Sequence, residues 1–235
     1  MLKKYLLILT LAISAVGITL GAEAVPKKTL NDRQASIVTV AALTAQGDLV
    51  QLKTALNTAL DRGMSINELK EVLVQMYAYA GFPRSLNGLN TLITVVDERQ
   101  AADISDEVGK EATPVDPGRD RRAIGTKIQT ELVGRPVAGR TYDFAPIIDT
   151  FLKEHLFGDI FERDILNYQE RELATVGALA GIGNVNAQLA SHMRVSMNVG
   201  LTPKQLRAAV QVLHNEVGSV TGTNAQKVLQ EVLQK

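Results

Sequence analysis

The chain of 235 residues contains no cysteine and no tryptophan, and aromatic residues make up only 4% of it. Without cysteine it forms no disulfide, no thiolate nucleophile and no thiolate metal site. The scarcity of aromatic residues, beside 46% hydrophobic residues overall, favours helices rich in Ala, Leu and Val over a β-sandwich. Lys and Arg together number 25, as do Asp and Glu. Because no net charge attracts a polyanion, we expect no nucleic-acid partner.

Residues 1–24 are predicted to be a signal peptide. Lys3 and Lys4 form a basic start, residues 5–20 are apolar, and Ala22-Glu23-Ala24 is a small-residue cleavage site. We therefore expect an exported protein, periplasmic or secreted, with no membrane association after cleavage. An uncleaved membrane anchor is the alternative, which the short apolar stretch disfavours.

Most of the remaining chain consists of one block that occurs twice. Residues 30–43 return at an offset of 136 (30 to 166), and after a one-residue insertion residues 69–81 return as 206–218. A duplicated unit of this length is one supersecondary block whose apolar face is covered by its twin. We expect three segments after the signal peptide: a first repeat at 30–98, a linker with one helix at 99–141 and a second repeat at 142–235.

The local pattern of both repeats is helical. Two equivalent positions, Ser65 and Thr202, each begin a capping box, which marks the start of a helix. The helix that begins at Ser65 is the third helix of the first repeat, and we expect it to reach Gly81. Between the repeats, 121–133 is expected to form a helix, and 151–159 an amphipathic helix followed by a tight turn. We therefore predict an all-α fold of two tandem helical repeats packed together.

Three stretches of the sequence resemble the carboxymuconolactone decarboxylase family. The first is 171–176 (Arg-Glu-Leu-Ala-Thr-Val), which is followed by His192 and by 200–202. The other two are 79–83 (Tyr-Ala-Gly-Phe-Pro) and 156–159 (Leu-Phe-Gly-Asp). The resemblance covers most of both repeats. It implies a helical fold that assembles into rings, so we expect a homo-oligomer. This is either a hexamer or a trimer, since three chains of two repeats each would place six repeats in one ring.

The same superfamily includes thiol peroxidases of the alkylhydroperoxidase-D type, which use a C-x-x-C-x-x-x-H run with a glutamate upstream. His192 occupies the histidine position and Glu172 matches the glutamate, but Val185 and Gln188 stand at the two cysteine positions. These side chains form neither a thiolate nor a disulfide. A peroxidase label inherited from the family is therefore disfavoured.

Glu172 and His192 are the strongest candidates for catalytic residues. Glu172 lies near the start of one predicted helix and His192 in the middle of the next, so the two side chains are expected to face one cleft. A carboxylate beside an imidazole holds one tautomer, an arrangement that suits proton transfer near neutral pH. Their first-repeat counterparts are Ser36 and Ala55, so the fold itself does not require either residue. The alternative is that both are surface residues that diverged after duplication.

Other candidates surround this pair. His214 has valines at i−4 and i+3, so we expect it to point inward, either as a further catalytic proton donor or as a buried structural histidine. Arg171 and Arg194 flank the pair and are candidates to bind a substrate carboxylate, with solvated or salt-bridged side chains as the alternative. Tyr79 is a candidate substrate-binding residue, although tyrosines at such positions are more often core or interface residues.

We predict no metal site, since the sequence lacks a His/Glu pair that presents two ligands on one helical face. By resemblance, the predicted activity is lactone decarboxylation or a related proton transfer on a small carboxylated or carbonyl compound, without an organic cofactor. In this scheme His192 supplies the proton and Glu172 orients it. Export argues against carboxymuconolactone itself as the substrate. The rival hypothesis is a non-catalytic binding protein that forms rings.

Overall fold

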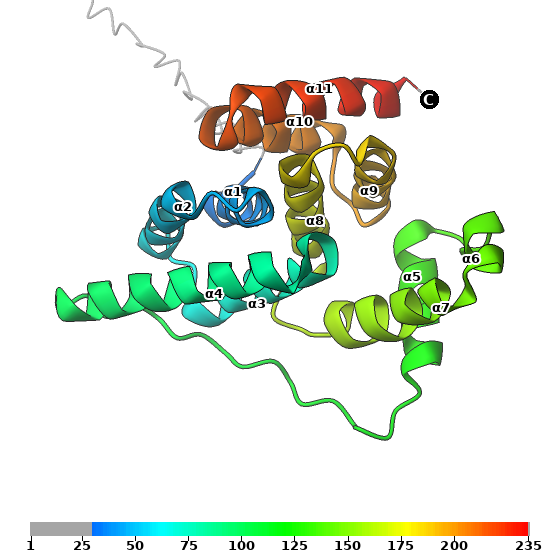
Figure 1. Ribbon diagram of the computed structural model, residues 1–235, viewed down its shortest axis with the longest axis horizontal. Helices are drawn as coiled ribbons and strands as arrows, with labels where there is room; N and C mark the ends of the chain where they lie inside the picture. Colours follow the sequence, from blue (N-terminus) through cyan, green and yellow to red (C-terminus); the bar gives the residue numbers. More distant parts are fainter. Residues whose placement is uncertain (1–29, 235) are drawn as a thin grey trace, which may run out of the picture.

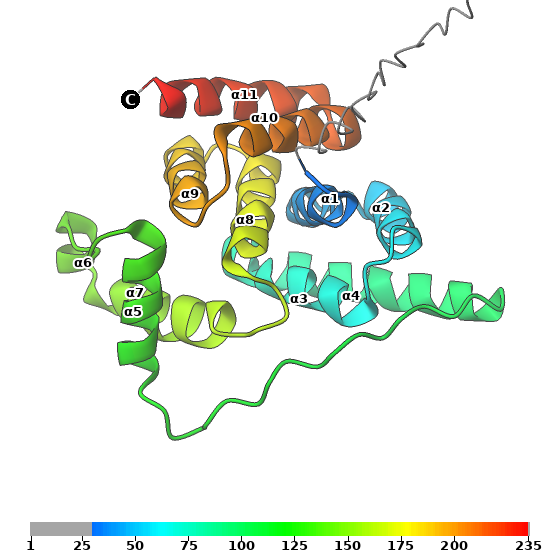
Figure 2. The same cartoon turned by 180° about the vertical axis from the view of Figure 1, so that it is seen from behind.

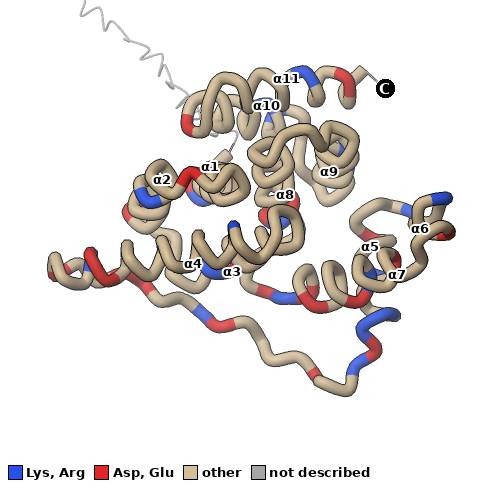
Figure 3. Tube along the Cα trace, viewed as in Figure 1, with Lys and Arg blue, Asp and Glu red and all other residues tan. Residues whose placement is uncertain are grey.

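The computed structural model describes residues 30–234, and within that range every regular element is a helix (Figure 1). The predicted signal peptide lies outside the described residues. None of the helices between residues 30 and 234 combines the length and hydropathy that a membrane crossing requires. Lys and Arg are interspersed with Asp and Glu over the described chain, as Figure 3 shows.

The two repeats contain equivalent sets of helices. The first repeat consists of α1 (Asp32–Gln46), α2 (Leu49–Asp61), α3 (Ile66–Gln75) and α4 (Tyr77–Ala101). The second consists of α8 (Tyr168–Ile182), α9 (Asn186–Asn198), α10 (Pro203–Val212), the π-helix η2 (Leu213–Val217) and α11 (Ser219–Leu233). The prediction of two all-helical repeats is confirmed.

Capping explains why these helices begin where they do. The side chains of Asn31, Ser65, Asn167 and Thr202 each accept a hydrogen bond from the backbone N–H three residues on, and each forms a reciprocal capping box. These bonds satisfy backbone N–H groups that have no partner inside the helix. Both capping boxes predicted at Ser65 and Thr202 are confirmed.

The end of the third helix differs from the prediction. α3 ends at Gln75 rather than at Gly81, and α4 begins at Tyr77. Met76 between them still has helical dihedral angles, and the helical path breaks only at Gly81, where φ is 82° and ψ is 161°. The equivalent Gly218 has φ 147° and ψ 148°. Both repeats therefore use a glycine at the same place, because L-residues rarely adopt these angles.

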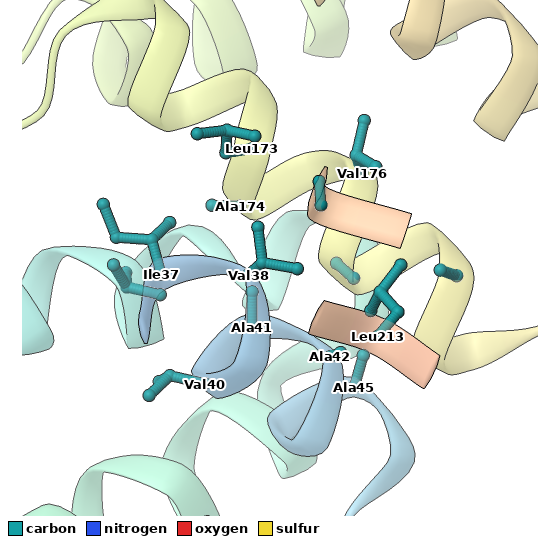
Figure 4. Packing of buried hydrophobic residues seen from close by; sticks show 14 of the residues in the cluster. Ile37, Val38, Val40, Ala41, Ala42, Ala45, Leu173, Ala174, Val176 and Leu213 are labelled. Carbon is teal, nitrogen blue, oxygen red and sulfur yellow. The ribbon is translucent and has the colours of Figure 1, made fainter. Parts of the chain in front are cut away.

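The core of the duplicated unit lies where α1 crosses α8 (Figure 4). Small residues allow the two backbones to approach closely. A Cβ atom added at Gly177 would lie 2.6 Å from the carbonyl oxygen of Val38, and one at Gly181 would lie 2.4 Å from that of Ala42. The crossing therefore has no room for a larger residue at either position.

The segment between α4 and α8 forms a separate helical cover. It contains α5 (Arg121–Val133), α6 (Arg140–Phe144), α7 (Pro146–Thr150) and the π-helix η1 (Phe151–Phe161). α5 has the predicted bounds and ends at Gly134, whose φ is 78°. It packs on η1 so closely that a Cβ at Gly125 would lie 1.6 Å from the carbonyl oxygen of Lys153. Figures 1 and 2 show this cover on the side of α8 and α9 away from α1 and α2.

η1 is not the amphipathic helix and tight turn that the sequence suggests. It is a continuous π-helix over 151–161, which changes the angular spacing of its side chains. Phe157 and Phe161 are buried, whereas Phe151 is 58% exposed. A second apolar cluster joins η1 to α5 and α9; its buried members are Ile128, Leu132, Leu156, Phe157, Ile160, Phe161 and Val195.

Candidate functional site

The structure brings Glu172 and His192 into direct contact. Glu172 lies in the second turn of α8 and is completely buried, whereas His192, in the middle of α9, keeps 20% of its side chain exposed. The distance between His192 Nδ1 and Glu172 Oε2 is 2.8 Å. Because an ionised carboxylate only accepts hydrogen bonds, Nδ1 carries the proton and Nε2 is the nitrogen left free for a ligand.

The pair lies in the wall of a cavity of about 230 Å³, which we call the repeat-two cavity. The cover formed by α5 and η1 closes it on the side opposite α8 and α9. Its lining residues are Gln129, Leu132, Val133, Arg135, Val137, Ala138, Tyr142, Leu152, Leu156, Phe157, Glu172, Ser191, His192 and Val195. Eight of these fourteen residues are apolar and six are polar or charged, and small-molecule sites likewise combine apolar contacts with placed polar groups.

Two polar residues of this cavity were not among the sequence candidates. Arg135, just after α5, is exposed and forms no ion pair within residues 30–234. Gln129 is 4% exposed, and its Oε1 has no hydrogen-bond partner in the described part of the chain. A buried acceptor without a partner is uncommon and is satisfied when a ligand donates to it. The sequence offers one indication of a special role for both residues, which is that the segment containing them has no counterpart in the first repeat.

Tyr79 contacts the pair from the first repeat. Its ring meets the His192 ring edge to face, with the centroids 5.9 Å apart and an interplanar angle of 86°. Burial of the Tyr79 hydroxyl, and secondly the charge of Glu172, raises the pKa of Tyr79 well above its usual value, so the phenol stays protonated. Tyr79 does not itself line the repeat-two cavity. Its side chain contacts the His192 ring and not the cavity itself.

Arg171 lies outside the cavity, in a buried ion-pair network between the repeats. It is completely buried, and its Nη2 donates to Glu71 Oε1 at 2.8 Å while its Nη1 donates to Gln75 Oε1 at 3.0 Å. Arg163 binds the same carboxylate at 2.9 Å. Burial opposes ionisation of Glu71, but the hydrogen bonds from Arg163 and Arg171 outweigh it and lower the pKa of Glu71. This matches the salt-bridged alternative for Arg171.

Neither Arg194 nor His214 lines the repeat-two cavity. Arg194 is exposed on α9. The expectation that His214 points inward is wrong, because His214 is exposed. It lies in η2, a π-helix, where the α-helical spacing of its neighbouring valines does not apply. Within residues 30–234 no three His, Asp or Glu side chains cluster as metal ligands do.

The first repeat also has a cavity. This repeat-one cavity has a volume of about 350 Å³. Its lining residues are Ser36, Thr39, Leu43, Val50, Gln51, Thr54, Ala55, Thr58, Arg62 and Glu216. Ser36 and Ala55 occupy the positions of Glu172 and His192, and Glu216 occupies that of Tyr79. The repeat-one cavity therefore takes one side chain, Glu216, from the second repeat, whereas the repeat-two cavity takes much of its wall from the cover.

Comparison with known proteins identifies the family. The model of the carboxymuconolactone decarboxylase family matches residues 13–93 and 148–230, one region for each repeat. The first region begins inside the predicted signal peptide. No curated protein matches the chain. Since the two regions together cover more than half of the sequence, the chain belongs to the carboxymuconolactone decarboxylase family and contains two copies of its unit.

Proposed function

We propose that the repeat-two cavity is an active site that decarboxylates a small carboxylated compound with a conjugated carbonyl group, or transfers a proton on such a compound. One observation carries this proposal: His192 is held by a buried carboxylate 2.8 Å away, with its other ring nitrogen free on the cavity wall. A histidine oriented in this way is suited to general acid–base catalysis. Family membership supports the same class of reaction.

In the proposed reaction, the bond between the substrate and its departing carboxylate breaks and CO₂ leaves. The electron pair moves into the conjugated carbonyl and forms an enolate. Protonated His192 then donates its Nε2 proton to the enolate carbon, and solvent restores that proton. Glu172 holds the imidazole in one orientation and stabilises its charged form, a role that needs contact with His192 only.

Arg135 and Gln129 would position the substrate. Arg135 is the one arginine among the lining residues, which include no lysine, and it suits an anionic group that the substrate keeps during the reaction. It is not suited to the carboxylate that leaves, because stabilising that charge would oppose the loss of CO₂. The unpartnered Oε1 of Gln129 would accept a hydrogen bond from a hydroxyl group of the substrate.

A panel of β-keto acids and carboxylated lactones tests this proposal, with CO₂ release as the measured quantity. We expect His192→Gln to lower kcat by about 10²–10⁴-fold and Glu172→Gln by a smaller factor. His214→Gln is the matched control, since it removes an exposed histidine that lies outside the cavity, and it should retain full activity. If the wild type turns over no compound of the panel, or both site variants remain fully active, the chain is better described as a non-catalytic binding protein.

We also propose that the protein is exported and forms a ring-shaped homo-oligomer. The exposed apolar side chains of α4 support self-association: Phe82 is 63% exposed, Leu86 54% and Ile93 58%. They follow one another at near-helical spacing and so form a stripe. Light scattering on purified protein should give three or six chains per particle, and cell fractionation should find the processed chain outside the cytoplasm. A monomer, or an unprocessed chain in the cytoplasm, would contradict the respective proposal.

A further inference from the structure

The repeat-one cavity is open to a ligand but lacks the groups that the proposed reaction requires. Ser36 stands where the second repeat has Glu172, and Ala55 stands where it has His192, so the cavity contains no general acid or base of that kind. Its polar groups are different ones. Glu216 from η2 and Arg62 at the end of α2 place opposite charges in the same lining.

These two charges do not neutralise each other. Within residues 30–234 neither Glu216 nor Arg62 forms an ion pair; the Glu216 carboxylate instead accepts a hydrogen bond from Thr39, with 2.8 Å between Glu216 Oε2 and Thr39 Oγ1. That bond fixes the carboxylate against α1. A purely anionic ligand would be repelled by Glu216 and a purely cationic one by Arg62. A ligand that carries both charges is attracted by both.

A buried hydroxyl group points to the same site. Ser36 is 3% exposed, lines the cavity, and its Oγ has no hydrogen-bond partner in the described part of the chain. Buried hydroxyl groups are normally paired, so this one has a hydrogen bond available for a ligand. On α1, Ser36 lies one turn from Thr39, which holds Glu216. The hydroxyl and the carboxylate are thus neighbours in one wall.

The remaining lining residues are in part apolar and in part the polar Gln51, Thr54 and Thr58. Leu43, Val50 and Ala55 form the apolar part, and Val50 is 82% exposed at the edge of the cavity. From this combination of charges, a free hydroxyl and aliphatic contacts, we infer that the repeat-one cavity binds a small zwitterion, namely a free amino acid with an aliphatic side chain. Its ammonium group meets Glu216 and Ser36, its carboxylate meets Arg62, and its side chain contacts the apolar part of the lining. The site binds this ligand without transforming it.

Isothermal titration calorimetry with the full chain tests this inference, using L-valine as the probe. Isobutylamine and 3-methylbutanoate are matched probes, because each lacks one of the two charged groups of valine. We expect valine to bind with a Kd of about 1 mM or below, and each matched probe to bind at least tenfold more weakly. The inference is overturned if valine gives no binding heat, or if either matched probe binds as tightly as valine.

Substitutions then locate the site. Glu216→Gln and Arg62→Gln should each weaken valine binding at least tenfold, and Ser36→Ala about threefold. Glu231→Gln and Arg207→Gln, which change exposed residues outside the cavity, are controls that should leave the Kd unaltered. His192→Gln should also leave it unaltered, which separates this site from the repeat-two cavity. Unchanged affinity in both Glu216→Gln and Arg62→Gln would overturn the assignment.

Discussion

Substitution of Gly177 by alanine tests whether the close crossing of α1 and α8 limits the stability of the whole protein. The added Cβ would lie 2.6 Å from the carbonyl oxygen of Val38 and 3.3 Å from the Cβ of Ala41. A normal carbon–oxygen contact is roughly 3.2 Å or longer, so the backbones must separate by about half an ångström. Overpacking of this kind costs about 1–3 kcal/mol. Alanine regains up to about 1 kcal/mol through its higher helix propensity.

The net expectation for Gly177→Ala is therefore a loss of about 1–2 kcal/mol in the free energy of unfolding. Urea denaturation followed by circular dichroism at a fixed protein concentration measures it, because self-association would otherwise shift the midpoint. Gly88→Ala is the matched control. The three atoms nearest to its Cβ would be side-chain atoms of Leu73 and Thr44, the closest at 2.8 and 3.1 Å, whereas the closest atom at Gly177 is a backbone oxygen. If Gly177→Ala were as stable as Gly88→Ala, the reasoning about the crossing would be refuted.

Three further outcomes follow from the ion pairs and the cavity. Arg171→Met should lower the free energy of unfolding by about 3 kcal/mol in urea, since Glu71 is left with one of its two arginines. The pKa of Glu71 is lower in the folded state than in the unfolded state, so its stabilising contribution is complete above roughly pH 4.5 and is lost as the pH falls. Glu71→Gln should therefore flatten the acid side of a plot of stability against pH, and an unchanged plot would contradict this. Arg135→Gln should raise KM about tenfold with a smaller change in kcat, whereas an unchanged KM would show that Arg135 does not bind the substrate.

The helices and their starts could be predicted from the sequence because their signals are local. Ser65 and Thr202 begin helices through hydrogen bonds to residues three positions away. Contact between Glu172 and His192 could also be predicted, since neighbouring helices of one repeat hold them. The buried ion pair of Arg171 could not be predicted from the sequence, because its partner Glu71 lies in the other repeat, 100 residues away.

Other features could not be predicted from the sequence, each for a physical reason. The prediction for His214 assumes α-helical spacing, but His214 lies in a π-helix, where side chains follow a different angular period. Arg135 and Gln129 carry no motif, and they reach the cavity only because α5 packs on η1 and α9. The repeat-one cavity could not be predicted either, since comparison of the two copies shows that the first repeat has no counterpart of Glu172 and His192 but does not show whether a cavity remains there.

The central claim is that His192, oriented by Glu172, delivers a proton to carbon. The most direct test is turnover in D₂O of whichever compound the wild type decarboxylates, with the deuterium position in the product read by proton NMR. We predict a single deuterium on one face of one carbon in the wild type, and in His192→Gln a much slower reaction without this facial selectivity. Stereospecific labelling that persists at an unchanged rate in His192→Gln would contradict the account.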